Sequence, residues 1–119
     1  MEIIDSGRFE PAADGSANFV EHLQVPALSF GTYSIPAGAA DPQSPHNEDE
    51  IYIVTRGRGS FTSGDQTVAV EPGTALFVPA REAHRFHDVT EDLVVLVFFG
   101  PAYSGIPADL QLQQGELPG

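Results

Sequence analysis

The stretch EIYIVTRGRGSFTSGDQTVAVEPGTALFVP, residues 50–79, alternates short runs of strand-forming residues with turn-forming residues. Four runs have the composition of strands: 50–54, 59–63, 67–71 and 75–79. Between them, Ser63-Gly64-Asp65-Gln66 and Pro72-Gly73 are typical of tight turns, because glycine tolerates positive φ and proline fixes φ near the value that a turn needs. This stretch therefore predicts a series of antiparallel hairpins.

The same pattern continues on both sides of this stretch. Further strands are predicted at 27–35, 84–89 and 93–99, with a turn at Thr90-Glu91-Asp92. No apolar pattern has the 3.6-residue period of a helix, so we expect an all-β sandwich or barrel. The run LVVLVFF at 93–99 is apolar on both faces. It predicts cover on both faces, by the N-terminal segment or by another subunit.

The composition excludes several classes of protein. The chain has 119 residues, enough for one domain, and no cysteine, which rules out disulfides and thiolate metal sites. Its formal net charge is −12, with five arginines and no lysine, which argues against binding to nucleic acid or to anionic membranes. The N-terminus resembles no signal peptide, and no apolar run is long enough to span a bilayer. We therefore expect a cytoplasmic protein.

The four histidines are the first candidates for chemistry, because imidazole binds metals and titrates near neutral pH. His46 lies four residues before Glu50, and His84 opens a predicted strand. If the hairpins fold over each other, these three side chains converge at the mouth of the barrel, and two imidazoles with a carboxylate suit a divalent first-row metal. His87 falls on the opposite strand face from His84, where an exposed or interface position is expected. His22 has no interpretation from the sequence.

The spacing Gly38-x7-His46-x3-Glu50-x6-Gly57, followed by Gly73-x5-Pro79-x4-His84, resembles the two motifs of the cupins. Cupin motif one reads G-x5-H-x-H-x(3,4)-E-x6-G, and motif two reads G-x5-P-x-G-x2-H-x3-N. This chain departs from the motifs at three positions. Ser44 stands where the first histidine is expected, Arg81 where a glycine is expected, and Asp88 where an asparagine is expected.

The resemblance implies a fold and a division of the chain. The fold is a cupin-type jelly roll, or double-stranded β-helix barrel, of antiparallel strands. The division is an N-terminal arm at 1–26, a barrel at 27–100 and a C-terminal tail at 101–119 that packs on the barrel or on a partner subunit. One helical turn is expected in the tail around 107–113.

The resemblance also implies a ligand set for a metal. His46, Glu50 and His84 match the positions that hold a divalent ion in cupins, with iron, manganese, nickel and zinc all suited to such ligands. Ser44, the amide oxygen of Gln43 or water is available to fill the position that the missing histidine leaves.

Other residues near the motifs have two interpretations each. Arg81 needs a positive φ if its turn keeps the family's shape, and its guanidinium either attracts an anion at the pocket mouth or lies in solvent. Asp88 is either an acceptor for a ligand imidazole or a turn residue. Tyr52 and Phe86 either line an apolar pocket together with Arg81 and Asp88, or they pack the core. Glu48 is expected to be a solvated loop acid.

Two classes of function follow from the resemblance. The first is a metal-dependent enzyme that acts on a small oxygen-rich molecule, as a dioxygenase, isomerase or lyase. The second is a metal-poor module that binds a small ligand or regulates without catalysis, and Ser44 favours this second class. In both, a homodimer is expected, because the apolar strand at 93–99 needs cover. The sequence does not select a reaction or a substrate.

Overall fold

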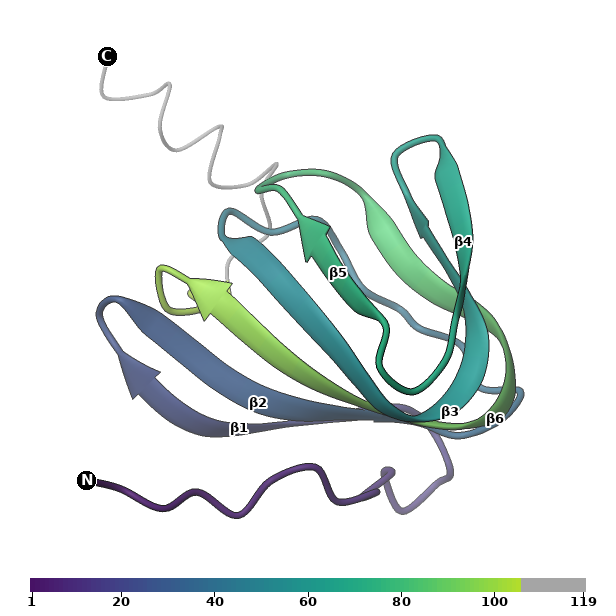
Figure 1. Cartoon of the computed structure of the whole chain (residues 1–119), viewed down its shortest axis with the longest axis horizontal. Helices are drawn as coiled ribbons and strands as arrows, with labels where there is room; N and C mark the ends of the chain where they lie inside the picture. The colour runs from purple at the N-terminus through teal and green to yellow at the C-terminus, as the bar shows by residue number, and fades with distance from the viewer. Residues whose placement is uncertain (106–119) are drawn as a thin grey trace.

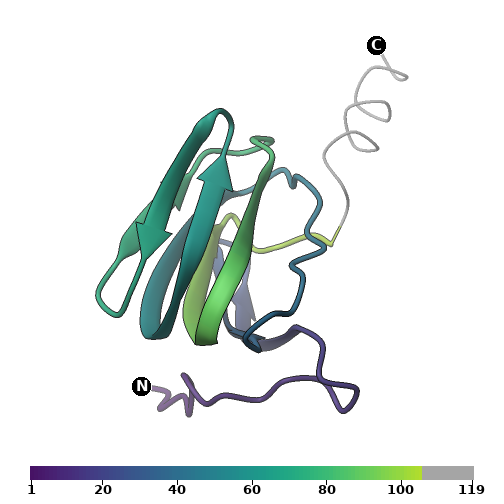
Figure 2. The ribbon, with the colours of Figure 1, turned by 90° about the vertical axis from the view of Figure 1, so that its right-hand side faces the viewer.

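The computed structural model describes residues 1–105, which form six strands and no helix (Figure 1). The strands are β1 (Asn18–Val25), β2 (Leu28–Ile35), β3 (Asp49–Ser63), β4 (Gln66–Val70), β5 (Ala75–Val78) and β6 (His84–Gly100). They form one antiparallel sheet in the order β1-β2-β6-β3-β4, and β5 pairs with β3 off this path. The long strands β3 and β6 are strongly curved, so the sheet bends back over itself (Figures 1 and 2). The all-β prediction is confirmed.

The structure changes three of the predicted elements. Residues 18–25, which the prediction placed in an N-terminal arm, form β1 and pair with β2. The predicted strands at 84–89 and 93–99 are one continuous strand, β6, and the turn predicted between them does not form. Likewise, 50–54 and 59–63 both belong to β3. The glycines and acids that look like turn residues in the sequence lie instead at bulges in the pairing of β3 with β6.

Two glycines show why the chain bends where it does. Gly57 has a φ of +92°, and a Cβ atom built there would lie 2.1 Å from the backbone oxygen of Asp92. Only glycine allows β3 and β6 to approach so closely at this bulge. Gly73 has a φ of +96°, and its N–H donates to the carbonyl of Val54 at 2.8 Å. The predicted turn before β5 is therefore present. The helical turn predicted around 107–113 lies outside the described residues.

The inner faces of the strands pack into one core with an aromatic centre. Its fully buried side chains include Ile35, Tyr52, Val54, Val78, Phe86, Leu93, Val95 and Val97. The ring of Phe86 lies 5.0 Å from that of Tyr52 and 4.7 Å from that of Phe61, between centroids. This cluster packs beneath His84, the first residue of β6.

The outer face of the sheet is covered in part by the N-terminal segment, which runs below β1 and β2 in Figure 1. The N–H of Gly7 donates to the hydroxyl of Thr32 at 3.0 Å, and the N–H of Glu10 donates to the hydroxyl of Ser34 at 2.9 Å. A Cβ atom built on Gly7 would lie 3.8 Å from the side chain of Leu96, so the N-terminal segment, one of the two alternatives predicted to cover 93–99, reaches that strand. Residues 1–105 contain no helix that is long and apolar enough to cross a membrane.

Candidate metal centre

His46, Glu50 and His84 meet inside the barrel. His46 lies in the loop before β3, Glu50 is the second residue of β3, and His84 is the first residue of β6. The Nε2 atoms of His46 and His84 lie 2.9 Å and 3.1 Å from Oε1 of Glu50. One ligand atom from each residue lies within 4.8 Å of the others, and all three residues are buried. These three residues were predicted from the sequence as one set of metal ligands, and in the structure they lie close together.

Closure of the sheet, and not strand pairing, makes them neighbours. In the β3–β6 ladder, Glu50 pairs with Phe99 while His84 pairs with Ser63, so the two ligand candidates stand at opposite ends. β5 returns the chain, because Val78 pairs with Glu50 and only a short loop separates it from His84. The curvature of the sheet thus places the His84 imidazole beside the Glu50 carboxylate, although the two residues lie at opposite ends of the β3–β6 ladder.

The hydrogen bonds of the two imidazoles leave one nitrogen of each ring directed at Glu50. Nδ1 of His84 lies 2.8 Å from the backbone carbonyl of Glu82, and Nδ1 of His46 lies 3.3 Å from that of Glu48. Because a carbonyl only accepts, Nδ1 carries the hydrogen, and each neutral ring has its lone pair on Nε2. Within residues 1–105, Nε2 of His46 and both carboxylate oxygens of Glu50 have no hydrogen-bond partner.

Such a cluster of buried acceptors requires a positive charge at its centre. The pKa values of two of the groups reflect this. Burial acts to raise the pKa of the Glu50 carboxyl, but the imidazoles of His46 and His84 outweigh burial and hold that pKa below its usual value. Burial acts to lower the pKa of His84, but the Glu50 carboxylate and the Glu82 carbonyl raise it above its usual value. The site therefore attracts either a proton or a metal ion.

A chain of buried hydrogen bonds links this triad to Asp41. The hydroxyl of Tyr52 lies 3.1 Å from Nε2 of His84 and donates to Oε1 of Gln43 at 2.8 Å. The Gln43 amide in turn donates to Asp41 at 2.7 Å, and Asp41 also accepts from the hydroxyl of Tyr33. The amide oxygen of Gln43, one of the alternatives named with Ser44 and water for the open position, is thus engaged with Tyr52.

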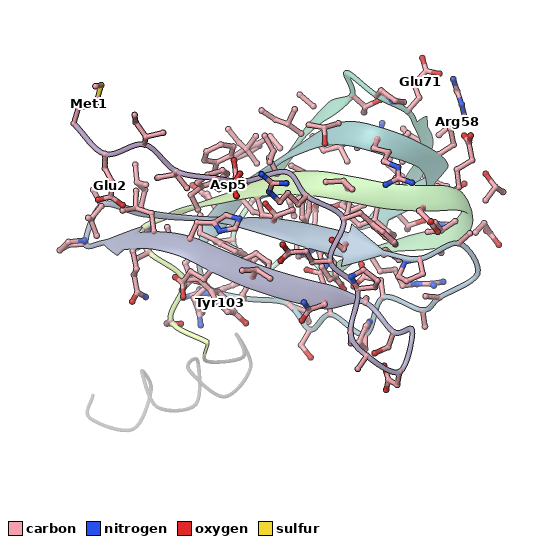
Figure 3. All side chains as sticks on the ribbon, turned by 90° about the horizontal axis from the view of Figure 1, so that it is seen from below. Met1, Glu2, Asp5, Arg58, Glu71 and Tyr103 are labelled. Atoms are coloured by element: carbon pink, nitrogen blue, oxygen red, sulfur yellow. The ribbon has the colours of Figure 1, made fainter. Side chains whose placement is uncertain are left out.

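A cavity of about 220 Å³ lies beside the triad. Its lining consists of Phe19, Tyr33, Pro42, Gln43, Ser44, His46, Glu50, Tyr52, Val97, Phe99 and Tyr103. Ser44 lies in this lining and is exposed, as expected of a residue at the cavity mouth. Figure 3 shows Tyr103 on the other side of the molecule from Arg58 and Glu71. These two residues form an ion pair, with Nη1 of Arg58 2.6 Å from Oε2 of Glu71.

Three other candidate residues lie outside this lining. Phe86 is fully buried and packs the core below Tyr52. Arg81 has the expected positive φ, at 71°, but it is exposed, and its backbone N–H donates to the carbonyl of His46 at 2.7 Å. Asp88 is also exposed, because a φ of 48° interrupts the strand alternation and turns its carboxylate towards His87. Arg81 therefore supports the loop of His46 through its backbone.

Sequence reasoning missed several residues around the site. The prediction that Glu48 is a solvated loop acid is wrong, since Glu48 is 3% exposed and its Oε1 has no hydrogen-bond partner in the described part of the chain. Extending the alternation of β3 backwards would have placed Glu48 on the inner face with Glu50 and Tyr52. Asp41 carries no comparable signal, because Tyr33 and Phe86, two of its three partners, lie on other strands.

Known proteins share this fold. A family model described as Cupin domain matches residues 31–99, which is more than half of the chain. An uncharacterized protein of Streptomyces coelicolor is 42% identical over 101 residues, covering 85% of this chain and 95% of the relative. Among solved structures, KdgF from Halomonas sp. matches with a TM-score of 0.71 at 19% identity, over 82% of this chain and 89% of that one. A putative mannose-6-phosphate isomerase from Ralstonia eutropha matches with a TM-score of 0.66 at 25% identity, over 77% and 91% of the two chains.

Proposed function

The chain belongs to the cupin family and has its jelly-roll fold, and within that family we propose that it is a metal-dependent protein that acts on a small molecule. In this proposal His46, Glu50 and His84 hold a divalent cation, and the small molecule binds in the adjacent cavity. The observation that carries the proposal is the convergence of three buried ligand groups, of which Nε2 of His46 and both oxygens of Glu50 have no hydrogen-bond partner among the described residues. Dioxygenase, isomerase and lyase chemistry are all compatible with such a site.

The donor set fits a first-row divalent ion. The Nε2 atoms of His46 and His84 lie 2.9 Å and 3.1 Å from Oε1 of Glu50, and all three residues are buried, so His46, Glu50 and His84 would hold a single cation between them. The Nδ1 contacts to backbone carbonyls hold both rings in the tautomer that a metal needs. Iron, manganese, nickel and zinc all suit imidazole and carboxylate ligands, so the identity of the ion stays open.

A divalent ion in this position supplies a Lewis acid that polarises an oxygen atom of the substrate. The residues of the chain bind and orient. Burial raises the pKa of Tyr52 well above its usual value, so its hydroxyl stays protonated beside His84. That hydroxyl has one hydrogen, which it donates to Gln43, so Tyr52 holds the Gln43 amide in the lining of the cavity. The aromatic side chains of the lining offer apolar contacts to a ligand.

The metal content of the purified protein tests the proposal. We expect about one equivalent of a first-row metal in the parent, and a loss of most of it in His84→Ala, because a site with one imidazole and one carboxylate binds weakly. His87→Ala is the matched control, since His87 lies three residues away on the same strand and contacts Thr62 and Asp88 instead. Substoichiometric metal in the parent, unchanged in His84→Ala, would contradict the proposal.

A second function, that of a metal-poor ligand-binding or regulatory module, is favoured by one observation. Ser44 occupies the position of the first motif histidine and lies at the cavity mouth, so a fourth protein ligand is lacking there. This function predicts that small molecules bind equally well before and after chelation of the metal. Titration of the chelated and the metal-loaded protein with one probe distinguishes the two functions.

We also propose that the chain forms a homodimer through the outer face of its sheet. Five apolar side chains are direct cross-strand neighbours in one row, which we call the outer row: Leu23, Phe30, Phe98, Ile51 and Phe77. Ile51 and Phe77 are 43% and 63% exposed. Because the chain carries a net charge of −12, an uncharged row is the part of its surface on which two copies repel least. The cytoplasmic location stays a prediction.

A further inference from the structure

The cavity beside the triad has no cationic side chain in its lining, which restricts what it can bind. All five arginines of the chain lie within residues 1–105: Arg8, Arg56, Arg58, Arg81 and Arg85. All five are exposed, and none contributes to the cavity. The remaining residues, 106–119, contain neither lysine nor arginine. A phosphate or a polycarboxylate is normally held by arginine or lysine, and this chain offers neither at the cavity.

Buried carboxylates add negative charge to the same region. Glu48, Glu50 and Asp41 are 3%, 1% and 7% exposed. Burial, together with the charges of Glu48 and Glu50, raises the pKa of Tyr103, whose ring lines the cavity. The field of these acids therefore reaches the space where a ligand lies. A divalent cation balances the charges of Glu48 and Glu50 and leaves no surplus for a dianion.

One wall of the cavity, next to the triad, is aromatic: the ring centroids of Phe99 and Tyr103 lie 4.9 Å and 5.9 Å from that of His46. The rings of Phe99 and Tyr103 are stacked with centroids 4.7 Å apart, and Phe19 meets Phe99 edge-on at 6.4 Å. Val97 and Pro42 complete this apolar side. The polar groups of the lining are Gln43, Ser44, His46, Glu50 and the hydroxyls of three tyrosines, so the cavity offers polar atoms beside an aromatic wall.

We propose that the ligand of this cavity is a small apolar molecule with a single metal-chelating oxygen head, neutral or singly negative, and an aromatic or aliphatic body against the Phe99 wall. This proposal rests on the proposed function, because the head needs the metal. Sugar phosphates and other polyanions are excluded by the same charges. At about 220 Å³, the cavity fits a body of about one ring and is smaller than the pockets that hold drug-sized ligands.

Calorimetric titration of the metal-loaded protein with three probes tests this proposal. Benzohydroxamate and acetohydroxamate share the same chelating head and differ in the apolar body, and glucose 6-phosphate represents a dianionic sugar. We expect benzohydroxamate to bind about tenfold or more tighter than acetohydroxamate, because its ring leaves water for the aromatic wall. We expect glucose 6-phosphate to show no saturable binding. Equal affinities for the two hydroxamates, or tight binding of the phosphate, would overturn the proposal.

A charge-insertion variant sharpens the test. Ser44→Arg adds a cation at the exposed mouth of the cavity, and Ala13→Arg adds the same charge in the exposed N-terminal segment as a control. We expect glucose 6-phosphate binding to appear in Ser44→Arg and not in Ala13→Arg, with the metal content of each sample measured alongside. If the phosphate still fails to bind Ser44→Arg, charge is not what excludes it, and that part of the proposal is wrong.

The metal content of each titrated sample separates the two proposals. Protein that retains about one equivalent of metal but shows no preference for benzohydroxamate leaves the proposed function intact and overturns the ligand class. Protein that holds no metal after reconstitution overturns both. Benzohydroxamate that binds His84→Ala as tightly as the parent shows binding without chelation, which also overturns the proposal.

Discussion

His84 and His87 lie three residues apart on β6. Each contacts an acidic side chain, but the two differ in burial and in their hydrogen-bond partners. The side chain of His84 is fully buried, and Nε2 faces the Glu50 carboxylate, whose oxygens have no hydrogen-bond partner in residues 1–105. The side chain of His87 is 19% exposed, and both of its nitrogens are engaged, with Thr62 and with Asp88, each at 2.7 Å. A histidine–acid contact alone therefore does not mark a functional site. The acids differ instead: the Glu50 oxygens are buried and have no hydrogen-bond partner in residues 1–105, whereas the Asp88 side chain is 81% exposed.

The largest expected effect is the difference in the free energy of unfolding between substitutions of an inward and an outward side chain of β6. Phe86→Ala removes a fully buried ring at the centre of the aromatic cluster, which we expect to lower the free energy of unfolding by about 3–5 kcal/mol. Arg85→Ala changes an exposed neighbour and is expected to cost about 0.5 kcal/mol or less. Urea denaturation of both variants measures the difference. Similar costs for the two would mean that the face assignment of β6 is wrong.

A second contrast concerns two aspartates near the same strand. Asp41 is buried and accepts from the Tyr33 hydroxyl, the Gln43 amide and the backbone N–H of Phe86. Asp41→Asn replaces one acceptor by a donor, so we expect a loss of about 2 kcal/mol or more in the free energy of unfolding. Asp88→Asn, at an exposed position, is the control and should cost about 0.5 kcal/mol or less. Equal losses would show that Asp41 does not anchor the network.

The pH dependence of the triad gives an effect of intermediate size. In the metal-free protein, the raised pKa of His84 stabilises the fold below about pH 6.5 and this stabilisation is lost as the pH rises through the folded pKa. The lowered pKa of Glu50 stabilises the fold above about pH 4.5 and this stabilisation is lost at lower pH. The pair therefore contributes most between these two values, where a proton occupies the site.

A metal must displace that proton, so its stabilising effect should grow with pH. We expect the metal-induced rise in Tm to be larger at about pH 8 than at about pH 5.5. Differential scanning calorimetry of metal-free and metal-loaded samples at both pH values measures it. His84→Ala is expected to lose the metal-induced rise at both. A larger rise at the lower pH would contradict the assignment of His84 as a ligand.

The smallest expected effect on stability comes from the outer row. Phe77→Glu places a charge on a ring that is 63% exposed, so the fold should lose about 1 kcal/mol or less. The same change should convert the proposed dimer to monomers, measured by analytical ultracentrifugation. Thr67→Glu, at an exposed position of β4, is the control and should leave the dimer intact. A parent that sediments as a monomer would contradict the dimer.

Local signals in the sequence were sufficient for much of the fold. Alternation predicted the strand at 27–35, the turn residues predicted the bends at Gly64 and Gly73, and motif spacing predicted the positive φ of Arg81. The prediction of separate hairpins was wrong for β3 and β6. Glycines and acids in a bulged strand have the same composition as a turn, and only the partner strand decides between the two.

The sequence by itself determined the all-β class and the cupin motifs, because residue spacing and side-chain alternation act within a few residues. The resemblance to the cupin motifs added His84 to His46 and Glu50, since no local signal joins residues so far apart in the chain. Closure of the sheet decided the rest. It buried Glu48, and it tied Asp41 to β2 and β6. It also turned Asp88 outward and surrounded the triad with aromatic rings from β1, β6 and the segment after it. These contacts join residues far apart in the chain, so their partners are set by how the whole sheet curves.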